Sequence, residues 1–142
     1  MIVLDSDHIS VLQHEDSPLA EPLLIRLEQS LTEVVVTAIT LEEQCRGWLA
    51  EIHRRAAGQA QVPYYARLVQ LFDFFASWRV LPFDQRAAVE FERLRQQHRR
   101  MGVMDLKIAA IALVQDATLI SRNLRDFEVI AELHVEDWLT GS

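Results

Sequence analysis

Apolar and polar residues follow two patterns along this chain, which predict short strands separated by amphipathic helices. Short runs of branched apolar residues, such as Ile2–Leu4 and Val34–Val36, are typical of strands buried on both faces of a sheet. Strands are predicted over residues 2–4, 34–36, 80–81, 118–120 and 133–135. Between them, apolar residues recur at helical spacing, as in the series Leu41, Cys45, Trp48, Leu49 and Ile52.

Capping residues and helix breakers predict where the helices begin and end. Helices are expected over 9–14, 19–29, 64–78 and 104–115, with one from Thr40, one capped by Asp84 and a short one near Asp126. Ser6 or Asp7 is expected to cap the first helix, and Gly58–Pro63 to break the helix that starts at Thr40. Strands alternating with helices favour the α/β class: a three-layer sandwich with a short parallel sheet of four to five strands flanked by helices.

Length and composition narrow the class of protein. The 142 residues fit one domain, 1–142, and half of them are apolar, so a sizeable core can be buried. The longest apolar run, Ile108–Val114, is too short to span a bilayer, which excludes a membrane protein. Cys45 is the only cysteine and the N-terminus lacks a basic region, so no internal disulfide and no secretory signal are expected. We therefore expect a cytoplasmic protein.

The charge balance is acidic, with 14 Lys and Arg against 21 Asp and Glu. A net charge of −7 argues against a protein that coats nucleic acid through phosphate contacts, but not against a nuclease, because metal-binding carboxylates add negative charge themselves. Lys107 is the only lysine, so 13 of the 14 basic residues are arginines, which suit bidentate phosphate contacts. An Arg-rich surface composition is an equally simple explanation.

Acidic and short polar residues follow the predicted strands. Asp5 comes directly after the first strand, and Asp105 opens the helix before the fourth. The other polar residues near strand ends are Thr37, Thr40, Glu42, Glu43, Ser121, Asn123 and Asp126. Carboxylates brought close together repel unless a cation compensates, and hard oxygen ligands suit Mg²⁺ or Mn²⁺. Since such ions activate water and stabilise phosphoryl oxygens, a metal-dependent phosphodiesterase is the simplest chemistry.

Each of these acids also has a purely structural interpretation. Asp5 could cap the next helix, and an acid at Asp105 complements the helix dipole. Thr40-x-x-Glu43 is a capping box, and the helical wheel places Glu43 opposite the apolar stripe, so spacing alone does not choose between Glu42 and Glu43. Asn123 and Asp126 could likewise cap a short helix.

Four segments, in order along the chain, resemble the conserved segments of PIN domains. Ile2–Asp7 resembles the opening strand with its Asp, and Thr37–Gly47 resembles the second segment, in which the spacing selects Glu43 over Glu42. Gly102–Leu113 is the closest match, and Thr118–Phe127 resembles the last segment. Length and arrangement are similar to the VapC-like toxins of bacterial toxin–antitoxin pairs.

The resemblance implies a Mg²⁺- or Mn²⁺-dependent endoribonuclease that cuts RNA, is neutralised by an antitoxin and forms a homodimer. Catalytic roles are implied for Asp5, Glu43, Asp105 and Asp126, and metal ligation for Asp5, Asp105 and Asn123. Supporting roles fall on Ser6, Thr40 and Ser121, the last as a partner of Asp5 or of a metal-bound water. Asn123 stands where many members have Asp, so we expect one tight metal at Asp5 and Asp105 and a weaker second site.

Two further features are candidates for binding partners. Six aromatic residues crowd one predicted helix and suggest a groove for an antitoxin or a dimer surface: Tyr64, Tyr65, Phe72, Phe74, Phe75 and Trp78. Arg46 and Arg122 lie near the acids and are the only arginines favoured for RNA phosphate contacts. Arg93 and Arg95 are better explained as a solvated face, and no function is favoured for Arg99 and Arg100. His8 is expected to be a structural histidine rather than a substrate contact.

Two other functions are consistent with parts of the sequence. Asp5-Ser6-Asp7 resembles the D-x-D start of haloacid-dehalogenase-type phosphatases, although Ile9 departs from that pattern and no paired late acids follow. A PIN fold that binds RNA or protein without cleaving it is the second alternative, which Asn123 favours.

Overall fold

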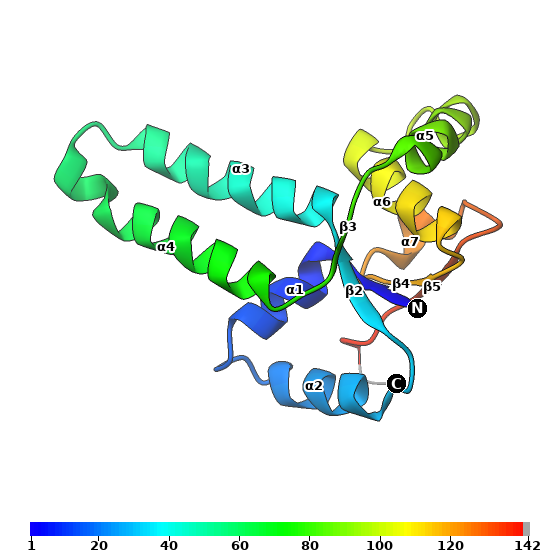
Figure 1. Ribbon diagram of the computed structural model, residues 1–142, viewed down its shortest axis with the longest axis horizontal. Coiled ribbons are helices and arrows are strands. Elements are labelled where there is room, and N and C mark those ends of the chain that lie inside the picture. The colour runs from blue at the N-terminus through cyan, green and yellow to red at the C-terminus, as the bar shows by residue number, and fades with distance from the viewer. Residues whose placement is uncertain (141–142) are drawn as a thin grey trace.

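Five short strands form one all-parallel sheet in the order β3-β2-β1-β4-β5 (Figure 1). The computed structural model describes residues 1–140; residues 141 and 142 of the predicted domain lie outside the described part. The strands are β1 (Ile2–Leu4), β2 (Val34–Thr37), β3 (Val80–Leu81), β4 (Thr118–Ile120) and β5 (His134–Glu136). Both β1 and β4 are buried on two faces, which confirms the predicted parallel sheet and the α/β class.

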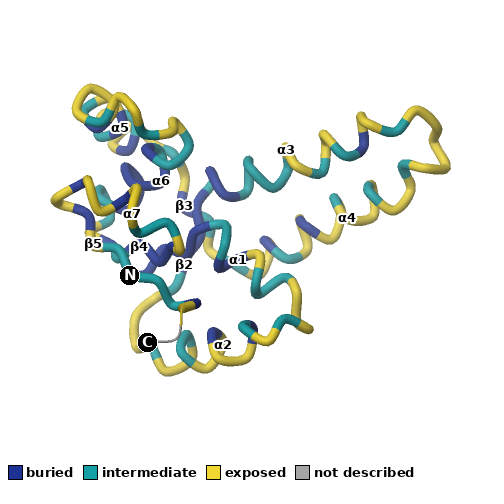
Figure 2. Tube along the Cα trace, turned by 180° about the vertical axis from the view of Figure 1, so that it is seen from behind, coloured by how far each residue is buried: buried dark blue, intermediate teal, exposed yellow. Residues whose placement is uncertain are grey.

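Seven helices connect and cover the strands in the described chain. They are α1 (Ser6–Gln13), α2 (Ala20–Gln29), α3 (Ala38–Arg54), α4 (Gly58–Ala76), α5 (Gln85–Gln97), α6 (Val103–Val114) and α7 (Leu124–Phe127). The pair α3 and α4 extends away from the sheet as a long hairpin (Figure 1), whose outer half is largely exposed in Figure 2. No helix in the part of the chain that the structure describes combines the length and apolarity needed to cross a membrane.

Alternate residues of the strands point to opposite faces of the sheet and supply two cores. Val3, Val35 and Leu119 pack with the buried side chains of α5 and α6 on one face. Leu4 and Ile120 pack with residues of α1 and α4 on the other. The apolar periodicity therefore places helices on both faces, and the sheet's carboxyl edge stays free for polar residues.

Three predicted helix boundaries are wrong, each because a neighbouring group satisfies the backbone differently. Asp5, rather than Ser6 or Asp7, is the N-cap of α1. Thr37 caps α3, accepting a hydrogen bond from the Thr40 backbone N–H at 3.2 Å, so Thr40 lies inside the helix and the predicted capping box does not form. Each cap lies at the end of a strand, since the strand passes directly into the helix.

The predicted break at Gly58–Pro63 is the first part of α4 instead. The turn between α3 and α4 is only residues 55–57, and the Gln61 side-chain amide donates to the carbonyl oxygens of Ile52 and Arg55, at 3.0 and 3.1 Å. Pro63 near the start of the helix removes one backbone hydrogen bond, a cost that the tight turn and the packing of the hairpin offset.

We expect Thr37→Val to lower the free energy of unfolding by about 1 kcal/mol, because the buried side chain keeps its shape but loses the cap of α3. Urea unfolding of the variant checks this, with Thr32→Val, an exposed site, as the matched control. Equal midpoints for Thr37→Val and the parent, or a larger loss from Thr40→Val, would contradict the observed start of α3.

Candidate active site

The carboxyl ends of β1, β2 and β4 meet at one edge of the sheet, and the chain delivers acids there. From β1 the chain passes to β2 on one side, whereas β4 and β5 lie on the other. The connections leave the sheet in opposite directions at β1 and β4, so the carboxyl ends of these two strands form a topological switch point. Open α/β sheets bind ligands at such a point. Asp5 lies at this point, and its backbone N–H donates to the Ile120 carbonyl oxygen at 2.9 Å.

Asp5 is buried, with 7% of its surface exposed, and both carboxylate oxygens are held. One accepts from the Ser6 backbone N–H at 2.7 Å, and the other accepts from the Ser121 hydroxyl at 2.8 Å. Burial raises the pKa of Asp5 to about 6, with the charges of Asp7 and Asp105 adding to the rise and the two hydrogen bonds opposing it. A buried carboxyl is thus fixed in place at the centre of the site, and Ser121 is its partner.

Glu43 lies near Asp5 on the early turns of α3. Burial raises the pKa of Glu43 to about 7, with the charges of Asp5 and Asp105 contributing. Glu42 instead forms an ion pair with Arg46 at 2.8 Å, one helical turn along. The structure therefore directs Glu43 toward the other acids, the residue that the family spacing selects and that helical periodicity alone left open.

Asp105 and the segment after β4 complete the cluster. Burial raises the pKa of Asp105, and the charges of Asp126 and Asp7 contribute. Asp126 itself is exposed, and its Oδ2 accepts a hydrogen bond from the Asn123 side-chain amide at 3.0 Å. That bond turns the NH₂ group of Asn123 toward Asp126 and leaves the amide oxygen as the only Asn123 side-chain atom able to bind a cation.

The donor set fits a hard divalent cation. It consists of carboxylate oxygens whose mutual repulsion favours protonation, and a cation would relieve that repulsion. Two hydroxyls next to these acids, Ser6 Oγ and Thr40 Oγ1, are buried without a hydrogen-bond partner, which is costly unless a bound group or water supplies one. Within residues 1–140 no three His, Cys, Asp or Glu side chains form a ready-made ligand set.

A buried chain of hydrogen bonds ties this site to the C-terminal segment. Asp7 accepts from the His8 ring Nδ1 at 2.6 Å through one oxygen and from the Arg122 backbone N–H at 3.0 Å through the other. His8 is fully buried, and its Nε2 accepts from the Trp138 backbone N–H at 3.1 Å. Burial raises the pKa of Asp7, but the bonds from His8 and Arg122 outweigh it, so that the pKa of this carboxyl lies below its ordinary value.

Asp7 thus holds the loop that carries Ser121 and Asn123, and His8 connects Asp7 to the segment at Trp138. Sequence reasoning gave His8 a structural place but missed the link to Asp7 and residue 138. The adjacent Asp7-His8 pair at a helix start was the available signal, whereas its partner across the fold is 130 residues away.

The predicted RNA-contacting arginines differ in what surrounds them. Arg46 is 70% exposed, and its guanidinium pairs with Glu42. The exposed Arg122 is next to Ser121 and forms no ion pair with any described residue, although its backbone N–H binds Asp7. Arg93 pairs with Glu90 and with Glu132, as expected for a solvated face.

Comparison with known proteins places this arrangement in a family. The PIN-domain family model matches residues 2–133, nearly the whole chain. The chain belongs to the PIN-domain family. This membership confirms the resemblance seen in the four sequence segments and leaves no support for the haloacid-dehalogenase alternative, whose proposed acid, Asp7, is bound by His8 and Arg122.

Curated and solved relatives resemble most of the chain. The chain is 26% identical over 121 residues to Ribonuclease VapC2 of Haemophilus influenzae, covering 82% of this chain and 84% of that protein. It is 25% identical to a chain in the structure of VapBC-1 from nontypeable Haemophilus influenzae, with a TM-score of 0.74 and coverage of 97% and 98%. FitAcB from Neisseria gonorrhoeae gives 26% identity, a TM-score of 0.70 and coverage of 97% and 98%.

Glu43→Gln should stabilise the metal-free protein at alkaline pH. The pKa of Glu43 is about 7 when folded and near 4.5 ordinarily, so the folded state holds a proton that the unfolded chain has released, and stability falls as pH rises through this window. In EDTA we expect the variant to have a higher Tm than the parent at about pH 8 and an equal Tm at about pH 4.

Glu28→Gln, at an exposed position on α2, is the matched control for this measurement, because its charge is not among those that raise the pKa of Glu43. A control that gains as much Tm as Glu43→Gln, or a gain that is the same at both pH values, would contradict the electrostatic account.

Proposed function

We propose that this protein is a divalent-metal-dependent endoribonuclease that hydrolyses RNA phosphodiester bonds and is the toxin of a toxin–antitoxin pair. The observation that carries the proposal is the meeting of Asp5, Glu43 and Asp105, from three separate segments, at the switch point of the sheet, where burial raises the pKa of each. Similarity to a protein named Ribonuclease VapC2 supports the reaction, and similarity to a chain of VapBC-1 supports the partner.

Asp5 and Asp105 would hold Mg²⁺ or Mn²⁺, with the Asn123 amide oxygen as a weaker ligand. When bound, the ion supplies a water of lowered pKa and stabilises negative charge on a phosphoryl oxygen. The Ser6 and Ser121 hydrogen bonds keep Asp5 in one orientation. Glu43 forms no hydrogen bond with any described residue, and its pKa of about 7 suits a group that takes a proton from the attacking water at neutral pH.

The α3–α4 hairpin is the proposed antitoxin-binding surface. Val62, Tyr65, Val69 and Phe72 lie at helical spacing on α4 and are each more than half exposed. Half of the predicted aromatic surface is not available, because Phe75 is buried in the core and Phe74 and Trp78 pack against it. The exposed α4 stripe, formed by Val62, Tyr65, Val69 and Phe72, is therefore the part of this helix that a partner's apolar side chains can cover.

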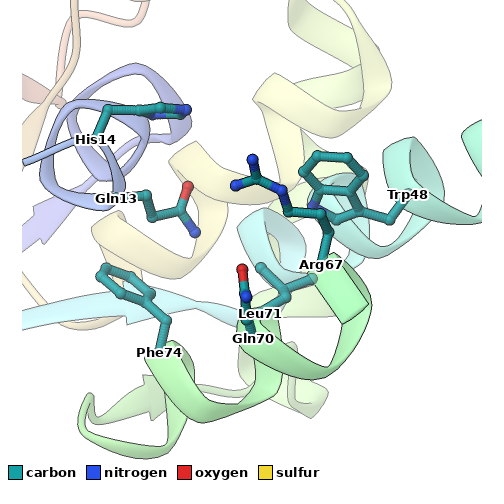
Figure 3. A pocket seen from close by; sticks show the side chains of 7 residues that line it. All are labelled: Gln13, His14, Trp48, Arg67, Gln70, Leu71 and Phe74. Atoms are coloured by element: carbon teal, nitrogen blue, oxygen red, sulfur yellow. The ribbon is translucent and has the colours of Figure 1, made fainter. Parts of the chain in front are cut away.

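A pocket of about 200 Å³ lies beside the hairpin, between α1 and α4 (Figure 3). Trp48 of α3 and Arg67 of α4 lie next to each other at its rim, with Gln13 and Phe74 opposite. The lining combines apolar side chains with amides and the Arg67 guanidinium, which forms no ion pair with any described residue, and would accept an apolar side chain flanked by an acid from the antitoxin. A homodimer is also proposed, supported by further exposed apolar side chains outside the hairpin, among them Val89 at 62%.

RNA cleavage should require the metal and the acids. In Mg²⁺ or Mn²⁺ the purified protein is expected to cut RNA, and EDTA should stop the reaction. Asp105→Asn should slow it by at least about 100-fold, because a ligand charge is lost while the side chain keeps its size. Gel analysis of cleaved RNA measures the rate, and Asp16→Asn, an exposed site on the α1–α2 loop, is the matched control.

Persistent cleavage in EDTA, or by Asp5→Asn, would overturn the metal mechanism. Binding of RNA without cleavage of any RNA tested would favour the alternative function, a PIN-fold binding module, which Asn123 at a position usually acidic in the family makes a specific second candidate.

Val69→Asp plus Phe72→Asp should abolish capture of the co-expressed antitoxin, since both side chains are exposed on the stripe and charges there cannot be buried without a partner. Co-purification and the Tm of the variant measure the outcome. Ala60→Asp, at an exposed position on the opposite side of α4, is the control for charge on this helix. Undiminished capture by the stripe variant would refute the surface.

A further inference from the structure

A cleft lies at the C-terminal end of α5 and beside Val129. It belongs to the part of the fold where α5, α6 and α7 lie together (Figures 1 and 2). Its volume is about 440 Å³, and it is lined by Gln96, Gln97, His98, Arg99, Arg100, Met101 and Val129. This volume falls in the range of about 300–1,000 Å³ that small-molecule sites span, enough for a nucleotide-sized group. Nothing in the proposed reaction or in the antitoxin surface uses these residues.

The cleft adjoins two of the acids through the chain itself. Met101 is followed by Gly102, which lies against Asp105: a carbon placed on its Cα would be 3.9 Å from Asp105 Oδ2. Val129, on the other wall, comes three residues after Asp126, and the charge of Asp126 acts on Asp105. Both walls of the cleft are therefore connected to acids of the site by segments of three or four residues.

The charge of the cleft is opposite to that of the protein. Arg99 and Arg100 are exposed, and neither forms an ion pair with any described residue. Several arginines elsewhere are paired with glutamates, among them Arg46, Arg54, Arg55, Arg79 and Arg93. In a chain of net charge −7, two unpaired guanidiniums on one rim are available to phosphates rather than to the protein's own acids.

The other lining groups suit bases rather than an apolar ligand. Gln96 offers an amide donor and acceptor, and Gln97 offers its amide donor while its oxygen accepts from Arg93 at 3.1 Å. The His98 ring can stack on an unpaired base. An acidic protein segment would use the arginines but leave the amides and the ring without a role. The combined chemistry favours a nucleotide chain.

We propose that this cleft binds the single-stranded RNA segment next to the scissile phosphate, with Arg99 and Arg100 contacting its backbone and Gln96, Gln97 and His98 facing its bases. This inference rests on the proposed ribonuclease function. It assigns substrate binding to two arginines for which the sequence favoured no function. Of the two sequence candidates, Arg46 is paired with Glu42, and Arg122 forms no ion pair with any described residue.

The test measures binding of a fluorescein-labelled RNA 12-mer of mixed sequence by anisotropy, in EDTA so that no cleavage occurs. Arg99→Gln plus Arg100→Gln should weaken binding by about 10-fold, and the slope of log K against log salt should fall by about 1.4, the value for two lost single-strand phosphate contacts. Arg54→Gln plus Arg79→Gln removes the same charge far from the cleft and should change affinity less than about 2-fold. Replacement of Arg99 and Arg100 by lysine should restore most of the slope.

Equal losses in the cleft and control variants, or an unchanged salt slope, would overturn the proposal. Normal RNA binding by the cleft variant together with lost antitoxin capture would identify an acidic protein segment as the occupant and overturn it as well. Cleavage is assayed separately with Mn²⁺. If the parent protein binds RNA through the cleft but never cuts it, only the ribonuclease function is refuted. If the parent cuts RNA, and the Arg99→Gln plus Arg100→Gln variant keeps the parent's salt slope, only the proposal for the cleft is refuted.

Discussion

Burial of carboxyls that the sheet brings together, with the repulsion among them as a smaller contribution, is the constraint on which the rest of this structure depends. Asp5 is fixed at the end of the central strand, and its two hydrogen bonds leave it no alternative orientation. Glu43 and Asp105 arrive from two different helices, so the fold itself maintains their proximity, and burial raises their pKa values along with that of Asp5. Such an arrangement lowers the stability of the fold at neutral pH unless a cation binds. Functional sites in proteins commonly reduce stability in this way.

The scaffold around the acids keeps this unfavourable arrangement from relaxing. The Ser121 hydroxyl accepts from the Asn123 backbone N–H at 3.0 Å while donating to Asp5, which joins the last loop to the first strand. Asp7 and the buried His8 connect the same loop to the segment at Trp138. Residues 5–8 are therefore hydrogen-bonded to residues 121, 122 and 138. These bonds keep the site rigid, and catalysis requires functional groups held in fixed positions.

The sequence allowed prediction of the parallel sheet, the elements and the acids, because buried strands and polar strand ends are local signals. Asp84 was recognised as a cap for the same reason, and it accepts from the Ala87 backbone N–H at 2.9 Å. The caps at Asp5 and Thr37 were misplaced by a few residues, since a strand that passes straight into a helix leaves no loop to mark the boundary. The orientation of Glu43, the burial of Phe75 and the His8 link depend on contacts between distant segments, which periodicity does not encode.

Calorimetric titration of Mn²⁺ at about pH 6.5, in buffers of different ionisation enthalpy, tests the central claim most directly. A cation that binds by relieving carboxyl repulsion must displace the protons held there, and pKa values of about 6 and about 7 correspond to about one proton released per protein at this pH. Release of about one proton, lost in Asp5→Asn, is the predicted result. Mn²⁺ binding with no proton release, or no binding at all, would contradict the account.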